Sequence, residues 1–417
     1  MVRYGGTVHP GRVRDAAVRA AAAATDVDGF FDGVLGAMRP VLRSDLWAGV
    51  TLDPDTLMNT GGNFRHAVPR PYLARMLDIE YREGDVNGVA ELARAPEPVG
   101  LLGSAVGGVR GRSPRYRDIL YPLGLADELR VLLRDRYGVW GIMIIGLGPD
   151  APPFGPEARA VARSLTEPLG EALRRLHLSR RAREAGPAAG AGGYAPDPAL
   201  VLLDEEYGIV QLSPSAEFWL DELPALGERC PAGDGRPHGH CAGPDRRRTG
   251  APGRWTERIL PPAVYGIAAA VRSPGSSGSI SSWAHTATLG RVRLHAWLME
   301  GGGPARIAVS VEAAGPGEHL ALITAAHGLT PREGEIVSLV LRGHPTAEIA
   351  RLARLSPYTV QEHLKSVFDK TGVRSRRELV ATLFARHVEP EVLRAADTGG
   401  PAASGAVPGR LEPRRAR

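Results

Sequence analysis

The feature that most constrains how this 417-residue chain can fold is a series of helix start signals near its carboxyl end. In "LTPRE", Thr330 can cap a helix that opens on a proline, and Glu333 stands three positions after the cap, as in a capping box. Ser356 stands before another proline and can cap a further helix, and "SRRE" at 375–378 repeats the capping-box pattern. These closely spaced signals predict four short helices joined by tight turns, which is typical of a helix-turn-helix module.

Apolar residues within the predicted helices recur at helical spacing and mark the faces that must pack together. Gly343 ends the first helix, and the second, "TAEIARLA", is short. The third helix is expected at 357–370. The buried positions of the first, second and fourth helices are Ile336, Leu339, Val340, Ile349, Ala350, Leu379, Val380 and Leu383.

The string "LTPREGEIVSLVLRGHPTAEIARLARLSPYTVQEHLKSVFDKTGVRSRRELV" resembles the LuxR-type DNA-binding domain. The resemblance runs through the whole module without gaps and is carried by Leu329, Thr330, Arg332, Glu333, Gly343, Glu348, Ile349, Ala350, Ser356, Thr359, Val360, His363, Leu364, Lys370, Gly372, Val373 and Arg376. It implies that the third helix reads DNA and that the module acts as a dimer on two half-sites. The fourth helix, around Leu379 and Leu383, is then the expected dimer contact, although internal packing explains these leucines equally well.

The predicted third helix is amphipathic. Its apolar stripe consists of Val360, Leu364 and Val367, and its polar face of Tyr358, Gln361, Glu362, Lys365 and Asp369. Because the apolar stripe has to pack on the first two helices, the polar face is free for the DNA major groove.

The resemblance implies that Gln361, Glu362 and Lys365 reach base edges. Gln can bond adenine, Lys can donate to guanine, and Glu can accept from the cytosine amino group. Glu362 is either such a specificity determinant or a neutral residue at the rim. Tyr358, Thr359 and Lys370 are better placed for phosphate oxygens, which position the protein without reading sequence.

Lys365 and Lys370 are the only lysines of the chain, in which Lys and Arg together number 51. Lysine is a flexible point charge that suits guanine edges and phosphates, and it does not replace a stacking guanidinium. The alternative is a solvated helix face on which two lysines cluster by chance. The module carries nine basic and six acidic residues, a modest surplus that predicts salt-sensitive and weak DNA binding by one copy.

Three positions depart from the pattern of the family. Gly334 lies inside the first helix, where it costs about 1 kcal/mol relative to Ala. Ala353 stands where the family usually has Leu, and Arg354 where a turn glycine is common. We expect Leu352 to fill part of the space that Ala353 leaves.

Two segments have compositions that do not support a packed core. Residues 181–199 are crowded with Gly, Ala and Pro and are interpreted as a linker, and 389–417 as a disordered tail. The remaining domains are predicted at 1–180, 200–316 and 317–388.

Residues 1–180 are predicted to form an antiparallel α+β domain. An alanine-rich helix comes first, followed by strand-like runs "DLWAGVTLD" and "GVAELAR" and a hairpin in "ELRVLLRDRYGVWGIMIIGLG". A long exit helix closes the region, with Ala158, Val161, Leu165, Leu169 and Leu173 on one face. This order of strands and helices resembles a GAF domain, which implies a sensor role.

Residues 200–316 open with a strand that reaches Asp204, a turn at Gly208, a second strand and a helix. Ala216, Trp219 and Leu220 are expected to face inward from that helix. This opening resembles a PAS domain, and "WAHTATLGRVRLHAWLM" and "ARIAVSVEA" alternate as half-buried strands do. An inserted loop at 228–256 interrupts the resemblance.

Several kinds of chemistry are excluded by residues that the chain lacks. No lysine precedes Lys365, so neither a P-loop nor a phosphoacceptor receiver domain is expected before the module. Covalent bilin or flavin attachment to the sensor domains requires cysteine, and because none precedes Cys230 such attachment is not expected. The inserted loop contains Cys230, His238, His240 and Cys241, whose spacing is not a standard zinc pattern. We expect no metal site there, no cofactor, and core positions for Trp47, Trp140 and Trp219.

The sequence therefore predicts a multidomain protein with α+β GAF-like and PAS-like sensor domains followed by an all-α four-helix helix-turn-helix domain. Apolar runs are too short for a membrane span, and we expect a cytoplasmic, non-enzymatic, one-component transcriptional regulator. The expected partners are double-stranded DNA and a second copy of the chain, with RNA polymerase a candidate and a small-molecule effector unidentified. In the alternative, the front domains bind no ligand and serve only for oligomerisation or protein interaction. A third hypothesis is an enzyme with an accessory DNA-binding module.

Overall fold

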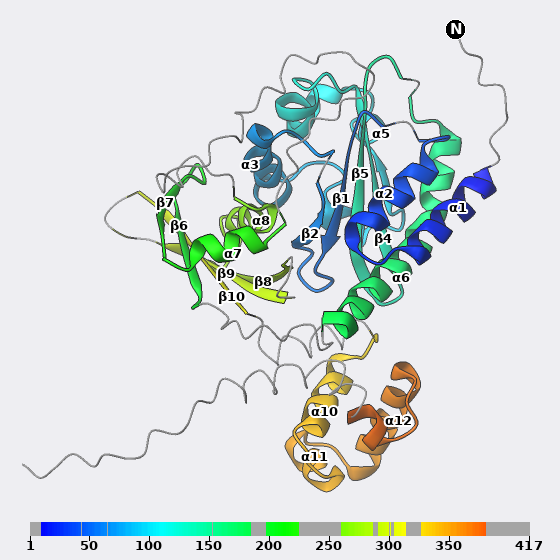
Figure 1. The fold of residues 1–417 in the computed structure, drawn as a ribbon, viewed down its shortest axis with the longest axis vertical. Helices are drawn as coiled ribbons and strands as arrows, with labels where there is room; N and C mark the ends of the chain where they lie inside the picture. The colour runs from blue at the N-terminus through cyan, green and yellow to red at the C-terminus, as the bar shows by residue number, and fades with distance from the viewer. Residues whose placement is uncertain are drawn as a thin grey trace, which may run out of the picture.

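The computed structural model describes residues 10–42, 44–64, 66–151, 153–184, 197–224, 260–286, 291–299, 301, 304–313 and 327–380 (Figure 1). The α-helices are α1 (Pro10–Ala23), α2 (Val27–Met38), α3 (Arg70–Asp78), α4 (Val89–Arg94), α5 (Leu102–Ala105), α6 (Pro156–Glu184), α7 (Ala216–Glu222), α8 (Pro262–Val271), α10 (Pro331–Leu341), α11 (Thr346–Leu352) and α12 (Pro357–Thr371). Shorter helical turns of other types are η1 (Ile79–Glu83), η2 (Arg110–Arg112) and η3 (Tyr116–Leu120). The strands are β1 (Leu46–Leu52), β2 (Asn59–Asn63), β3 (Val99–Leu101), β4 (Asp127–Asp135), β5 (Gly138–Leu147), β6 (Ala199–Leu203), β7 (Ile209–Leu212), β8 (Ser279–His285), β9 (Arg291–Met299) and β10 (Arg306–Ala313).

The strands form two antiparallel five-stranded sheets with the same order. The first sheet runs β2-β1-β5-β4-β3 and the second β7-β6-β10-β9-β8. When the five strands of each sheet are counted in chain order, the first and fifth are neighbours, and the second and third form the two edges. The predicted hairpin is confirmed as β4 and β5, whose pairing ends at Asp135 and Gly138. Sequence reasoning predicted two antiparallel α+β regions but not that they share one strand order.

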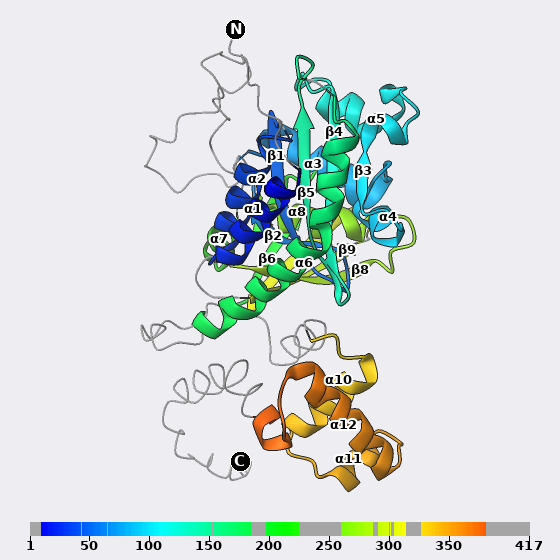
Figure 2. The same ribbon diagram turned by 90° about the vertical axis from the view of Figure 1, so that its right-hand side faces the viewer.

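The first sheet is buried on both faces. Every residue of β1 is buried, as are the first seven of β4. Helices α1, α2 and α6 cover one face, where the predicted inward residues of the exit helix lie in the core, and α3 and α4 cover the other (Figure 2). Strands buried on both sides show continuous apolar runs, which is what "GIMII" in β5 displays.

One predicted strand of the first region is wrong. The run "GVAELAR" forms helix α4, not a strand. Val89 and Leu92, three residues apart, are its buried residues, and Ala, Glu, Leu and Arg are all good helix formers. The Glu80 carboxylate accepts a hydrogen bond from the Val89 N–H at 2.7 Å, which satisfies one of the free donors at the start of the helix.

The second sheet is covered on its inner face by α7 and α8. Ala216, Trp219 and Leu220 are buried, as predicted, and the strands alternate buried and more exposed positions. The inserted loop at 228–256 lies outside the described residues. Helix α8 is buried along nearly its whole length, with only Tyr265 of intermediate exposure, as expected for a helix that is apolar all round.

The two α+β regions share an extensive contact through α8. Its Gly266 lies so close to Tyr81 that an added Cβ would stand 3.2 Å from the ring, and Met58 belongs to the core of the second sheet. The Tyr207 hydroxyl donates to the Asp78 carboxylate at 2.6 Å across the same contact. Helix α6 also extends to Glu184, four residues into the predicted linker. The two regions therefore pack as one body, with α8 between the second sheet and α3 (Figure 1).

The carboxyl-terminal module has the predicted helices. Helices α10, α11 and α12 occupy the expected positions, and 376–380 begin the fourth helix. Their core contains Ile336, Val340, Ile349, Ala350, Val360, Leu364, Val367 and Leu379. Leu379 thus packs inside the module, and Leu383 lies outside the described residues. In the part of the chain that the structure describes, no helix combines the length and apolarity required to cross a membrane.

Candidate nucleic-acid interface

Helix α10 begins with the predicted capping box. The Thr330 side chain accepts from the Glu333 N–H at 3.2 Å, and the Glu333 carboxylate accepts from the Thr330 N–H at 2.6 Å. Glu333 is nevertheless buried. Its carboxylate also accepts from the Ser366 hydroxyl and the Lys370 ammonium, both on α12 and each at 2.7 Å. The cap of the first helix thereby fixes the position of the third.

The charge of Glu333 is maintained by these contacts. Burial alone would raise the pKa of the carboxyl group, but hydrogen bonds from Lys370, Ser366 and the Thr330 backbone, together with the Lys370 charge, lower it to about 2. The ion pair is therefore present at every pH at which the protein is expected to work. Breaking a buried pair by removing one partner is costly because the other charge stays uncompensated.

The two lysines have different environments. Lys370 bonds inside the module, and its side chain is 30% exposed, whereas Lys365 is exposed and no ion pair to it is found in the described residues. Helical spacing could have indicated this difference, because Lys370 lies three residues after the buried Val367 and four after Ser366. Sequence reasoning missed it because a capping carboxylate is usually assumed to be fully occupied by its own helix.

Two arginines fix the turns around α11. The Arg332 guanidinium donates to the Ala353 carbonyl in the turn before α12, and Arg376 donates to the His344 carbonyl before α11. Arg354 has a φ of +53°, the left-handed conformation that explains why a glycine is common at this place. Leu352 is 42% exposed, so the expectation that it fills space beside Ala353 is wrong.

Helix α12 presents the expected two faces. Val360, Leu364 and Val367 are buried. Ser356 caps the helix, and its side chain accepts a hydrogen bond from the Thr359 N–H at 3.0 Å. Thr359 lies in the first turn and is half-buried. The opposite face is solvent-exposed and consists of Tyr358, Gln361, Glu362, Lys365 and Asp369, with Tyr358 73% exposed. Of the six sequence-predicted site residues, four thus lie on one open face, Thr359 at its edge, and Lys370 in the ion pair.

Further cations lie on the surface of the module. The exposed ones are Arg342, Arg351, Arg354, Arg374 and Arg377. Much of the negative charge of the module is engaged locally, since Glu335 pairs with Arg332, and Glu348 with His344 at 3.1 Å and Arg351 at 3.6 Å. A surface of this kind can attract phosphates around a helix that offers hydrogen-bonding groups to base edges.

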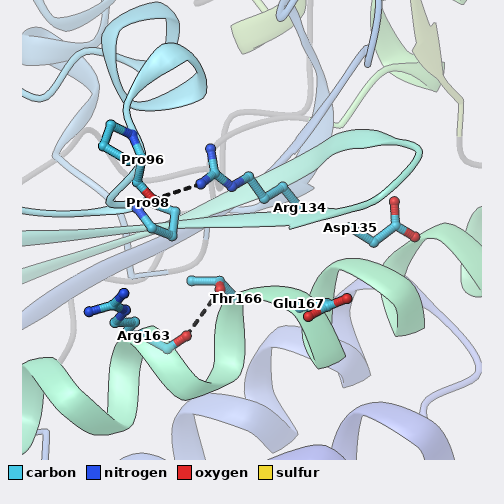
Figure 3. A pocket seen from close by; sticks show the side chains of 7 residues that line it. All are labelled: Pro96, Pro98, Arg134, Asp135, Arg163, Thr166 and Glu167. Atoms are coloured by element: carbon cyan, nitrogen blue, oxygen red, sulfur yellow. Dashed lines mark hydrogen bonds between the residues drawn. The ribbon is translucent and has the colours of Figure 1, made fainter.

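A groove opens in the first α+β region (Figure 3). It has a volume of about 280 Å³ and is lined by Pro96, Pro98, Arg134, Asp135, Arg163, Thr166 and Glu167. Two of its charged groups are bonded internally: Arg134 donates to the Pro96 carbonyl at 3.0 Å, and Asp135 binds Arg174 at 2.7 Å. Trp47, Trp140 and Trp219 are core residues, as expected.

Metal ligands do not gather in the described ranges, where no group of three or more His, Cys, Asp or Glu could hold an ion. Cys230, His238, His240 and Cys241 fall outside those ranges.

Comparison with known families locates the module. Residues 327–383 match the family model of "Bacterial regulatory proteins, luxR family". This segment is a LuxR-family helix-turn-helix domain. No curated protein matches the chain. The matched LuxR-family domain contains α10, α11 and α12 with the whole exposed face of α12, and the two sheets lie outside the match.

Proposed function

We propose that the protein is a one-component transcriptional regulator that reads the DNA major groove with α12. The observation that carries the proposal is the open polar face of α12 within the LuxR-family domain, opposite a stripe that is buried against the other helices. Recognition helices of helix-turn-helix proteins place such a face against base edges.

The exposed residues of α12 have the chemistry for both kinds of contact. Gln361, Glu362 and Lys365 are proposed to meet base edges, and Tyr358 and Thr359 the phosphate backbone. For Lys370, a phosphate contact would compete with a 2.7 Å ion pair to a buried carboxylate. We therefore propose that Lys370 acts mainly by holding α12 in position.

DNA reading by such modules commonly involves two half-sites and a symmetric dimer. A second copy of the chain is accordingly the proposed partner on DNA, and RNA polymerase a further candidate. Leu379 is engaged in the core of the module, so the amino-terminal part of the fourth helix contributes less to a dimer contact than its apolar pattern suggests.

The two α+β regions are proposed to control the DNA-binding domain as GAF-like and PAS-like sensors. In the alternative they bind no ligand and act as a scaffold, which the internal use of polar groups in the groove at Arg134 and Asp135 favours. Native mass spectrometry of the full chain distinguishes the two roles. A retained small molecule supports sensing, and a mass equal to that of the polypeptide supports the scaffold.

The DNA-reading proposal is tested with a site selected from random duplexes by the full-length protein. Lys365→Ala should weaken binding to that site by about 1 to 3 kcal/mol and relax the preference at one base pair. Arg163→Ala is the matched control, because it removes an exposed positive charge from α6, outside the LuxR-family domain. Equal affinities of Lys365→Ala and the parent at one salt concentration would refute the assignment.

A further inference from the structure

Two histidines far apart in the sequence meet at the contact between the α+β regions. His177 lies near the end of α6, and His285 ends β8. Nδ1 of His177 is 3.0 Å from Nε2 of His285. The ring planes are within 9° of parallel and the ring centres 5.1 Å apart, so the two nitrogens point at each other between the rings. This is the geometry of an N–H···N hydrogen bond, and it gives the two lone pairs no common direction toward a metal ion.

Both imidazoles are withdrawn from water. His177 is 2% and His285 4% exposed. Aromatic rings surround them. The centre of the Trp283 ring lies 5.0 Å from that of His285 and 6.3 Å from that of His177, and the centre of the Trp140 ring lies 6.4 Å from that of His177. A positive charge in such an environment is costly unless it is compensated.

Among the residues that the structure describes, charged side chains near this contact include Arg291, Asp55 and the Arg174–Asp135 pair. Arg291 of β9 is opposite His285 in the strand register, and its guanidinium lies 3.5 Å from the centre of the Trp283 ring. The Asp55 carboxylate, from the β1–β2 turn, interacts with Arg291. On α6, Arg174 is held by Asp135 at 2.7 Å, so this pair is neutral overall.

We propose that His177 and His285 form a pH-sensitive latch between the two α+β regions, closed while they share a hydrogen bond and opened when both are protonated. An N–H···N bond needs one N–H and one lone pair, so it can form between two neutral rings or between one neutral and one cationic ring. Two cationic rings have no lone pair for it and repel each other.

The direction of the pH effect follows from the number of bound protons. Separated imidazoles take up protons near pH 6.5, whereas the closed pair holds at most one extra proton. The open state therefore binds more protons in acid, and the contact is fully present above about pH 7 and lost progressively below about pH 6.5. Helix α8 keeps the two regions joined, so opening frees the end of α6 from β8 without separating the sheets.

The test uses the full-length protein and does not involve DNA, so its failure would leave the proposed function standing. Hydrogen exchange, corrected for intrinsic rates, is measured for the end of α6 and for β8 at about pH 7.5 and pH 5. We expect protection in both segments to fall by about tenfold or more at pH 5. In the His177→Asn/His285→Gln variant, whose amides can bond without titrating, protection should not depend on pH.

His295→Gln is the matched control, because His295 lies on β9 of the same sheet, against Trp297, outside the contact. It should lose protection in acid as the parent does. NMR of the ring nitrogens in histidine-labelled parent protein decides the question even if the double variant does not fold. Ordinary, independent titration of both rings with unchanged protection would overturn the latch, as would equal loss of protection in the parent and a folded double variant.

Discussion

The fourth strands of the two sheets each carry an arginine paired with a carboxylate, but the two pairs lie in opposite environments. Arg130 on β4 is 1% exposed and contacts Glu128 at 2.9 Å and Glu80 at 2.6 Å. Arg293 on β9 is 43% exposed and contacts Glu312 at 2.7 Å. The same strand order thus supports a buried charge network in one sheet and a surface ion pair in the other. The difference arises because helices cover both faces of the first sheet and one face of the second.

In the buried network of the first sheet, the cost of burying the carboxylates is offset by their cationic partners. Burial would raise the pKa of Glu80, but Arg130, Arg115 and the Val89 N–H hold it below its ordinary value. Arg115, fully buried, lies 2.8 Å from Glu128. Removal of one member leaves the other buried charges with fewer partners and without water, whereas exposed charges are hydrated when their partner is lost.

The largest effect is expected at α8, which packs against both α+β regions. Ile267→Asp places an uncompensated carboxylate at a fully buried position and should lower the free energy of unfolding by about 4 kcal/mol or more. Urea unfolding followed by fluorescence and circular dichroism measures the loss, and hydrogen exchange should show it in both sheets. Phe218→Asp, at an exposed position of α7, is the control and should change little. Loss of protection in the second sheet alone would show that the regions fold independently.

The comparison of the two arginines predicts the next effect. Arg130→Met should destabilise the protein by about 3 to 5 kcal/mol, because Glu80 stays buried without the cation that bonds it at 2.6 Å and Glu128 keeps only Arg115. The same urea experiment measures it. Arg130→Met/Glu128→Gln should recover part of the loss. A change below about 1 kcal/mol in Arg130→Met would mean that water compensates the two carboxylates.

In the LuxR-family domain, the contribution of the buried Glu333 carboxylate to stability can be tested by lowering the pH. The pKa of Glu333 is about 2 in the folded domain and 4.5 ordinarily, so the folded state binds fewer protons in acid. The stabilising contribution is present above about pH 4.5 and is lost as the pH falls toward 2. Hydrogen exchange of α10 and α12 between pH 5 and about 3 should show this loss. Lys370→Met should shift it to higher pH, and an unchanged profile in that variant would contradict the role given to the ion pair.

The smallest effect is expected for the exposed pair. Arg293→Met should change the free energy of unfolding by no more than about 1 kcal/mol, because surface ion pairs are screened and both groups are hydrated when separated. The ratio of this change to that of Arg130→Met measures how much burial increases the contribution of an ion pair to the free energy of unfolding. Similar losses in the two variants would contradict the difference drawn between the sheets.

Sequence patterns predicted the helical module well because its signals are local. Capping by Thr330 and Ser356 and the stripe of Val360, Leu364 and Val367 depend on residues within a few positions of one another. The assignment of Lys370 to phosphate was made without the long-range ion pair to Glu333, which no local pattern records. Which residues of α12 contact DNA stays a prediction.

In the α+β regions, local sequence patterns predicted most strands but not the contacts between distant segments. Alternation and apolar runs located eight of the ten strands, and β2 and β3 were not predicted. The run "GVAELAR" was misassigned to a strand because its short apolar pattern fits either a helix or a strand period. The contact through α8 and the pairing of His177 with His285, 108 residues apart, require the tertiary fold. The same holds for the fully buried Arg115 and Arg130, since arginine is rarely buried without partners that are distant in sequence.

The scarcity of lysine has a practical consequence for chemistry on this protein. Apart from the amino terminus, amine-directed dyes, cross-linkers and coupling resins have two targets, of which Lys365 is accessible and Lys370 is engaged with Glu333. Gentle acylation of lysine will therefore be directed to the middle of α12 without any engineered residue, beside the reaction of the amino terminus. Immobilisation through Lys365 will, for the same reason, turn the proposed reading surface toward the support.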